Sequence, residues 1–141
     1  MDEPVSLTIN KISRLSKRIT DRLLLPYGLR TSEIRFLGYM AEHGAVSHKD
    51  LQNVFRMTRA TVSQLVGNLK AAGLINMEES PSDRRQYVLT LSDKGTAVFG
   101  EAIRNIREID RKVASAFSPE ELSAFSEIAD KLIRLYEEEL C

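Results

Sequence analysis

Apolar residues recur at every third or fourth position through most of the chain, which is the spacing of one face of an α-helix. The first stripe covers residues 5–25 and ends at the helix breakers of "PYGL" (26–29). A second stripe, capped by Thr31 or Ser32, closes near His43. The pattern therefore predicts two helices before residue 45.

Two shorter helices follow, separated by a tight break. Ser47 begins a sequence that resembles a capping box in front of the helix 47–55. Thr58 is placed to cap the helix 58–72, and Gly73 stops it. Two short helices joined in this way are typical of a helix-turn-helix.

The apolar period then changes to two. "LINME" (74–78) and "QYVLTLS" (86–92) alternate and are rich in Ile, Tyr, Val, Leu and Thr, which favours a β-hairpin. Ser92 is expected to cap a long helix, and "SPEE" (118–121) has the N-cap, proline and acids that begin another. The predicted fold class is mainly α with a small β-hairpin.

The order of these elements predicts a winged helix-turn-helix at residues 31–91, flanked by helical segments 1–30 and 92–141. The terminal stripes carry more apolar surface than one small core can cover. A bundle within one chain is one explanation. A two-fold dimer is the preferred one, because DNA readers on a palindrome lie roughly 34 Å apart and a long helix can set that distance.

The exposed side of the helix 58–72 has the composition of a base-reading surface. Arg can bind guanine, Gln can bind adenine, and Thr or Ala can touch a thymine methyl. The alternative is an ordinary amphipathic helix with a polar outer face. The candidate major-groove residues are Arg59, Ala60, Thr61, Ser63 and Gln64, and the candidate phosphate contacts are Ser47, Lys49, Thr58, Asn68 and Lys70.

Charge is balanced overall but uneven along the chain. Twenty basic residues match twenty acidic ones, yet residues 47–73 hold four bases against one acid, and residues 114–141 hold seven acids against two bases. A single cysteine, Cys141, excludes an internal disulfide. No apolar run approaches the ~18 residues of a membrane span, and the first residues lack a secretory signal. We expect a soluble cytoplasmic protein with no membrane partner.

Motifs of catalysis are missing from the sequence. It contains no HExxH, CxxC, Gly-rich phosphate loop or Ser/His/acid set, which argues against an enzyme. Two isolated histidines do not make a metal cluster. We expect no cofactor and no metal.

Two segments together resemble the MarR family of bacterial transcriptional regulators, and the likeness extends over essentially the whole chain. "MTRATVSQLVGNLKAAGLI" (57–75) looks like the family's recognition helix, and "SDRRQYVLTLSDKG" (82–95) looks like its wing and the start of its long helix. The resemblance implies an obligate homodimer built from the first and last two helices. It also implies that the partner is double-stranded DNA with a pseudo-palindromic operator, to which the protein binds, usually as a repressor.

Within the wing, the resemblance assigns Asp83, Arg84 and Arg85 to the DNA minor groove. Arg85 matches the family's minor-groove arginine, Asp83 is the acid that orients it, and Arg84 occupies the variable middle position, where a phosphate contact is expected. The chain departs from the family at Met77, where an arginine is frequent, and at Gly67-Asn68, where an acid and an arginine are common.

Many family members are released from DNA by a small-molecule effector bound between the dimer helices and the winged domain. Tyr27, Tyr39 and His43 are the candidate lining residues, although each also fits an ordinary structural role. Sensing through Cys141 is not expected, because its neighbours in the sequence are glutamates and not the basic groups that activate a thiol. The functional alternative is a winged-helix protein-interaction module without DNA binding.

Overall fold

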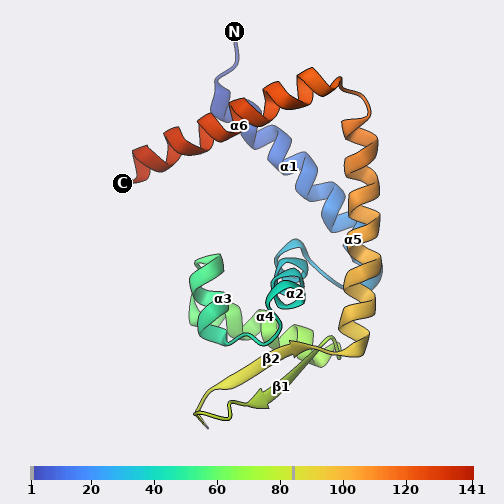
Figure 1. The fold of residues 1–141 in the computed structure, drawn as a ribbon, viewed down its shortest axis with the longest axis vertical. Helices are drawn as coiled ribbons and strands as arrows, with labels where there is room; N and C mark the ends of the chain where they lie inside the picture. Colours follow the sequence, from blue (N-terminus) through green and yellow to red (C-terminus); the bar gives the residue numbers. More distant parts are fainter. Residues whose placement is uncertain (1, 84) are drawn as a thin grey trace. The chain divides into compact units, whose positions relative to one another are not determined.

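The structure is a computed structural model that describes residues 2–83 and 85–141 (Figure 1). Contacts divide the chain into two compact units, one up to Arg104 and the other from Asn105, and each is described by itself. The elements are α1 (Val5–Leu24), η1 (Leu25–Tyr27), α2 (Thr31–His43), α3 (His48–Phe55), α4 (Arg59–Ala71), β1 (Ile75–Glu79), β2 (Tyr87–Leu91), α5 (Asp93–Ala114) and α6 (Pro119–Leu140). The predicted fold class and the predicted order of elements are confirmed.

The start of α2 differs from the prediction that Thr31 or Ser32 caps it. Arg30 is the N-cap residue, and its N–H donates to the Glu33 carboxylate at 3.1 Å. The Thr31 hydroxyl instead donates to Asp21 Oδ1 at 2.6 Å. The cap prediction was wrong because Thr31 ties the end of α1 to the start of α2.

The hydrophobic core lies in the first unit and is made mainly by the winged part of the chain. Burial of these side chains supplies the main driving force for folding this unit. The core residues are Leu24, Leu29, Ile34, Phe36, Leu37, Met40, Val46, Leu51, Val62, Val66, Leu69, Leu74, Ile75, Leu89 and Ala102. This core fixes α4 and the hairpin as parts of one body.

The hairpin forms in the expected antiparallel sense. Ile75 pairs with Leu91 and Glu79 with Tyr87, so the register places Met77 opposite Leu89. Val46, in the segment before α3, adds a bridge to Leu89 through two backbone hydrogen bonds of 2.7 and 3.0 Å. The hairpin is therefore held to the beginning of the helix-turn-helix.

The second unit comprises the end of α5 and the whole of α6. No residue of α6 is buried, although the helix carries an apolar stripe that includes Phe125 and Ile128. Ser118 caps α6 in a capping box with Glu121, as the sequence predicts. Among the described residues, no helix combines the length and apolar character that a membrane span requires.

Candidate nucleic-acid interface

Local sequence sets the start of both helices of the helix-turn-helix. The Ser47 hydroxyl accepts the Asp50 N–H at 3.0 Å, and the Asp50 carboxylate accepts the Ser47 N–H at 2.9 Å. The Thr58 hydroxyl accepts the Thr61 N–H at 3.2 Å. Both predicted caps are confirmed, and they satisfy N–H groups that a helix end leaves without partners.

The turn between α3 and α4 depends on Arg56. This residue ends α3 in the left-handed conformation, with φ of 52°. That conformation is uncommon for a residue with a side chain. It turns the chain sharply enough for α4 to begin at Arg59, three residues later.

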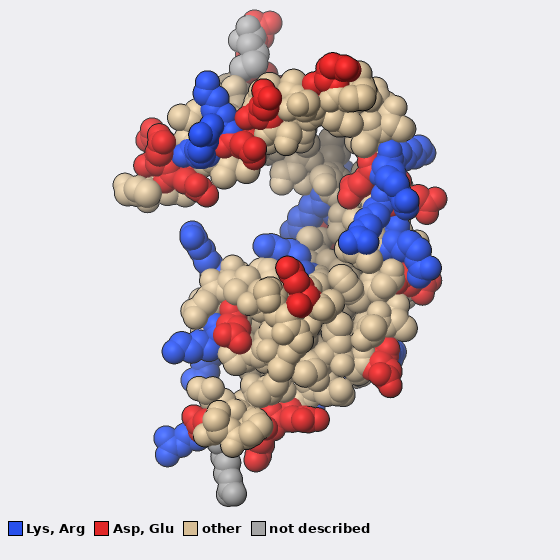
Figure 2. Space-filling view, viewed as in Figure 1, with Lys and Arg blue, Asp and Glu red and all other residues tan. Residues whose placement is uncertain are grey.

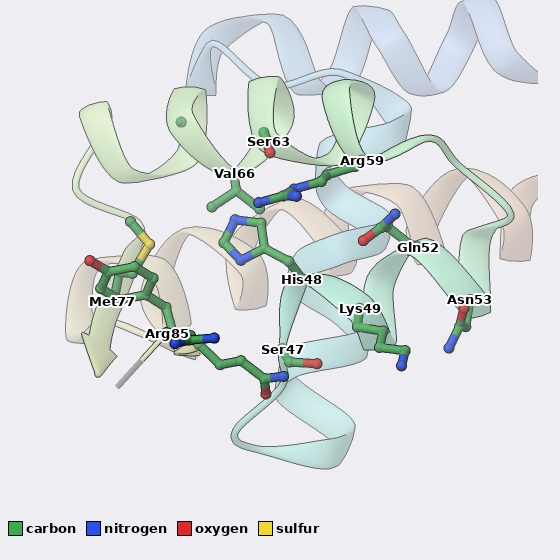
Figure 3. A pocket seen from close by; sticks show the side chains of 13 residues that line it. Ser47, His48, Lys49, Gln52, Asn53, Arg59, Ser63, Val66, Met77 and Arg85 are labelled. Carbon is green, nitrogen blue, oxygen red and sulfur yellow. The ribbon is translucent and has the colours of Figure 1, made fainter. Parts of the chain in front are cut away.

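A groove of about 710 Å³ lies between the helix-turn-helix and the hairpin, which forms the wing (Figure 3). α3, α4, β1, β2 and the turn between the strands all contribute to its wall. The lining residues are Ser47, His48, Lys49, Gln52, Asn53, Arg59, Ser63, Val66, Gly67, Met77, Arg85, Gln86 and Tyr87.

The exposed face of α4 carries all five residues that the sequence assigns to base reading. Arg59, Ala60, Thr61, Ser63 and Gln64 are exposed, while the opposite side of the helix packs into the core. Of these five, Arg59 and Ser63 line the groove. The structure therefore places the candidate residues on one accessible helix surface and brings two of them next to the wing.

The wing turn is organised by Asp83. Its Oδ1 accepts the backbone N–H of Arg85 at 3.0 Å, and its carbonyl accepts the N–H of Gln86 at 3.1 Å. The contact of Asp83 with Arg85 is therefore made to the main chain. Arg84, the third predicted wing residue, lies outside the described residues.

The predicted phosphate contacts fall into two groups. Ser47 and Lys49 line the groove, at the start of α3. Thr58, Asn68 and Lys70 are exposed, at the start of α4 and in its last turns. All five are accessible to a polyanion, and Thr58 also serves as the cap of α4.

Sequence reasoning predicted Ser47 and Lys49 but missed the other groove residues from α3 and those at the start of the second strand. Gln52, Asn53, Gln86 and Tyr87 line the groove, and His48 lies in its interior, where the Arg59 side chain reaches toward the imidazole (Figure 3). Partial burial and, secondarily, the Arg59 guanidinium lower the pKa of His48 from its ordinary value of 6.5. The local signal was the position of His48 directly after the Ser47 cap and beside Lys49.

The charge in the groove has one sign. Lys49, Arg59 and Arg85 contribute cations, and no Asp or Glu is found among the described lining residues. Lys and Arg also project from the edge of the molecule around α3 and the wing tip, although the wing strands carry acids of their own (Figure 2). A concave surface lined by cations and amides attracts an anionic ligand that also offers hydrogen-bond acceptors.

The candidate effector residues have other partners. The Tyr39 ring lies 4.2 Å from the His43 ring and 5.9 Å from the Phe55 ring, measured between centroids. Tyr27 lies in η1. Their role in binding an effector stays a prediction. No group of three or more potential metal ligands was found in the described part of the chain.

The fold and this groove define a winged helix-turn-helix protein, and known proteins share both sequence and fold with it. Residues 27–86 match the model of the MarR family. The transcriptional regulator PecS of Dickeya dadantii is 26% identical over 117 residues, covering 81% of this chain and 70% of PecS. The regulator BilQ of Clostridioides difficile is 25% identical over 119 residues, covering 84% and 80%.

Solved structures repeat the architecture. The MepR chain of a Staphylococcus aureus MepR–DNA complex superposes with a TM-score of 0.83 at 21% identity, over 96% of this chain and 99% of MepR. Over residues 27–86 the chain is similar to the MarR family, and its fold is that of the MepR chain. The resemblance inferred from the recognition-helix and wing segments is thereby confirmed.

Proposed function

We propose that this protein is a sequence-specific DNA-binding transcriptional regulator that acts as a homodimeric repressor in the cytoplasm. The observation that carries the proposal is the groove between α3, α4 and the wing, because its described charges are all cationic. Its curated relatives are transcriptional regulators, and MepR has been solved with DNA. Those relatives also favour a regulator over an enzyme.

In the proposed complex, α4 enters the major groove with its exposed face toward the bases. Arg59 and Gln64 supply the side chains suited to purine edges, and Thr61 and Ser63 add short polar contacts. The start of α3 supplies Lys49 for the adjacent phosphates. A helix N-terminus is itself favourable for an anion, which supports this placement.

The wing is proposed to reach the neighbouring minor groove with Arg85. A narrow minor groove concentrates negative potential and attracts a guanidinium. The hydrogen bond from the Arg85 N–H to Asp83 supports the proposal, because it holds the main chain from which the side chain extends. Arg84 is proposed to contact a phosphate.

Exposed apolar faces support the proposed homodimer. On α1, Ile12 and Leu15 are 58% and 47% exposed, and on α6, Phe125 and Ile128 are 67% and 60% exposed. Soluble chains seldom leave helical apolar stripes uncovered. Isologous burial of such stripes is the common symmetric solution. Release of this dimer by an effector near Tyr27, Tyr39 and His43 is the regulatory part of the proposal.

Replacing Arg85 tests the DNA-binding role of the wing. We expect Arg85→Ala to weaken binding of a labelled operator duplex roughly tenfold and to reduce the slope of log Kd against log salt by about one, because one phosphate-region cation is lost. Fluorescence anisotropy at several salt concentrations measures both quantities. Lys112→Ala, an exposed cation of α5 outside the groove, is the matched control and should change neither.

Two results would contradict parts of this proposal. Unchanged affinity and salt slope in Arg85→Ala would show that the wing assignment is wrong. A wild-type protein that binds no duplex in a salt-dependent way would refute DNA binding and favour the protein-interaction module.

A further inference from the structure

His48 lies in the interior of the groove, and neither the predicted base-reading set nor the predicted phosphate set includes it. It is the first residue of α3, directly after the Ser47 cap, and its side chain is half-buried. Figure 3 shows its imidazole between the α4 side chains Arg59 and Val66 on one side and the wing residue Met77 on another. Residues of α3, α4 and β1 thus meet in this part of the groove.

The charged groups that line the groove together with His48 come from α4, the wing turn and α3. α4 contributes Arg59, the wing turn contributes Arg85, and α3 itself contributes Lys49. β1 contributes the uncharged Met77 and β2 the phenol of Tyr87. The carboxylate nearest in sequence, Asp50, accepts the Ser47 N–H and does not line the groove.

This surrounding favours a neutral imidazole in the free protein. Partial burial penalises the charged form, and Arg59 repels a second positive charge, so the pKa of His48 is lower than usual. At neutral pH the groove then holds its three described cations and a neutral imidazole. An imidazole in this state still has one N–H donor and one acceptor nitrogen.

A phosphate backbone in the groove reverses that balance. Each backbone phosphate carries one negative charge, and its oxygens accept hydrogen bonds. This negative charge offsets the positive charges of Arg59, Lys49 and Arg85 and favours protonation of the second imidazole nitrogen. The protonated form donates from both ring nitrogens. In the neutral form, one ring nitrogen is an acceptor and cannot form a hydrogen bond with a phosphate oxygen. Binding of DNA and binding of a proton are thus mutually favourable.

We propose that His48 is a DNA-contacting residue of the groove that takes up a proton from solution when phosphates enter it, so that operator affinity rises as pH falls. The inference rests on the proposed function and adds a residue and a regulatory variable to it. The sign follows from linkage, because a ligand that raises the pKa of a group binds more tightly to the protonated protein. Affinity is constant above the pKa of the complex, rises as pH falls between the two pKa values, and levels off below the pKa of the free protein.

The test is the pH dependence of operator affinity at fixed ionic strength, measured by fluorescence anisotropy with a labelled duplex recovered by site selection. We expect the wild type to bind roughly three- to tenfold more tightly at about pH 5.5 than at about pH 7.5, since one unit of pKa corresponds to a factor of ten. His48→Gln keeps a polar side chain of similar reach but cannot titrate in this range. It should lose this pH dependence.

The chain offers a matched control, because His43 is its other histidine. His43 lies in the last turn of α2, where its ring contacts the Tyr39 ring in a tilted arrangement, and it does not line the groove. With no effector present, His43→Gln should retain the wild-type dependence on pH. Equal pH slopes in the wild type and in His48→Gln would overturn the proposal.

A second measurement uses only the wild-type protein, so it does not depend on whether the variant folds correctly. NMR titration of the His48 imidazole in the wild-type protein should give a higher pKa in the DNA complex than in the free protein. Identical pKa values would overturn the proton linkage while leaving DNA binding intact. A wild type that binds no DNA at any pH would instead refute the proposed function.

Discussion

Gly67 lies in the interior of α4, where it lines the groove, and packing among the described residues does not explain the absence of a side chain. Apart from its own stretch of helix, a Cβ at this position would meet no heavy atom of the described residues within 4 Å. Glycine in a helix interior costs about 1 kcal/mol relative to alanine. Gly67 therefore lowers helix stability without being required by packing inside the protein. Close approach of an outside ligand, which in the proposed complex is the DNA backbone, accounts for a glycine here.

Replacing Gly67 should therefore separate stability from binding. Gly67→Ala is expected to raise the free energy of unfolding by roughly 0.5–1 kcal/mol, through lower backbone entropy of the unfolded chain, and to weaken operator binding. Urea unfolding and anisotropy measure the two effects. Gly100→Ala, in α5, is the control, because its added Cβ also meets no other part of the described structure within 4 Å and should change stability alone. Unaltered operator affinity in Gly67→Ala would show that no close approach occurs there.

At the scale of single residues, the sequence predicts features that depend only on residues nearby in the chain, such as helix caps. The caps formed by Ser47, Thr58 and Ser118 follow from local patterns and are present. The groove position of His48 could not be predicted in this way. It depends on Arg59 and on the wing residues of the groove, which come near His48 only after α4 and the wing have packed.

The C-terminus of α4 and the N-terminus of α5 form one junction. The carbonyl of Ala72 accepts from Lys94 Nζ at 2.9 Å, and that of Gly73 accepts from Ser92 Oγ at 2.6 Å. The Ser92 hydroxyl also accepts the Gly95 N–H at 2.9 Å, which confirms its predicted cap. The start of the long helix thus satisfies carbonyls that the recognition helix leaves free.

Gly95 allows this junction to close. A Cβ at Gly95 would collide with the carbonyl group of Leu74, so any side chain must push α5 away from the α4–β1 turn. We expect Gly95→Ala to lower the free energy of unfolding by about 1–3 kcal/mol, the usual cost of overpacking. Thermal or urea unfolding measures this, again with Gly100→Ala as the contrasting variant. A Gly95→Ala protein as stable as the wild type would show that the junction can open without cost.

Among the elements, helix and strand identities were predictable because each has a distinct apolar period. The boundaries shift by one or a few residues, as with the hairpin strands predicted at 74–78 and 86–92 and found at Ile75–Glu79 and Tyr87–Leu91. The bridge from Val46 to the wing was not predictable, because it pairs residues 43 positions apart in the chain. Contacts of that separation leave no periodic signal.

Across the whole molecule the net charge is zero, but the basic and acidic residues are concentrated in different segments of the sequence. The segment of α3 and α4 is basic, whereas the last turns of α6 carry Glu137, Glu138 and Glu139. The exposed apolar stripes of α1 and α6 lie outside the buried core of the winged part. Charge near the groove and apolar surface on the terminal helices together fit a DNA-binding dimer.

In the proposed function, two copies of this chain read a symmetric DNA sequence through α4 and the wing. Selection of bound duplexes from a random DNA pool by the purified full chain tests this proposal. We expect enrichment of an inverted repeat whose half-sites lie about one helical turn apart, roughly 10 base pairs, or a multiple of that spacing. Enrichment of a lone half-site without a repeat, or of no sequence at all, would contradict it.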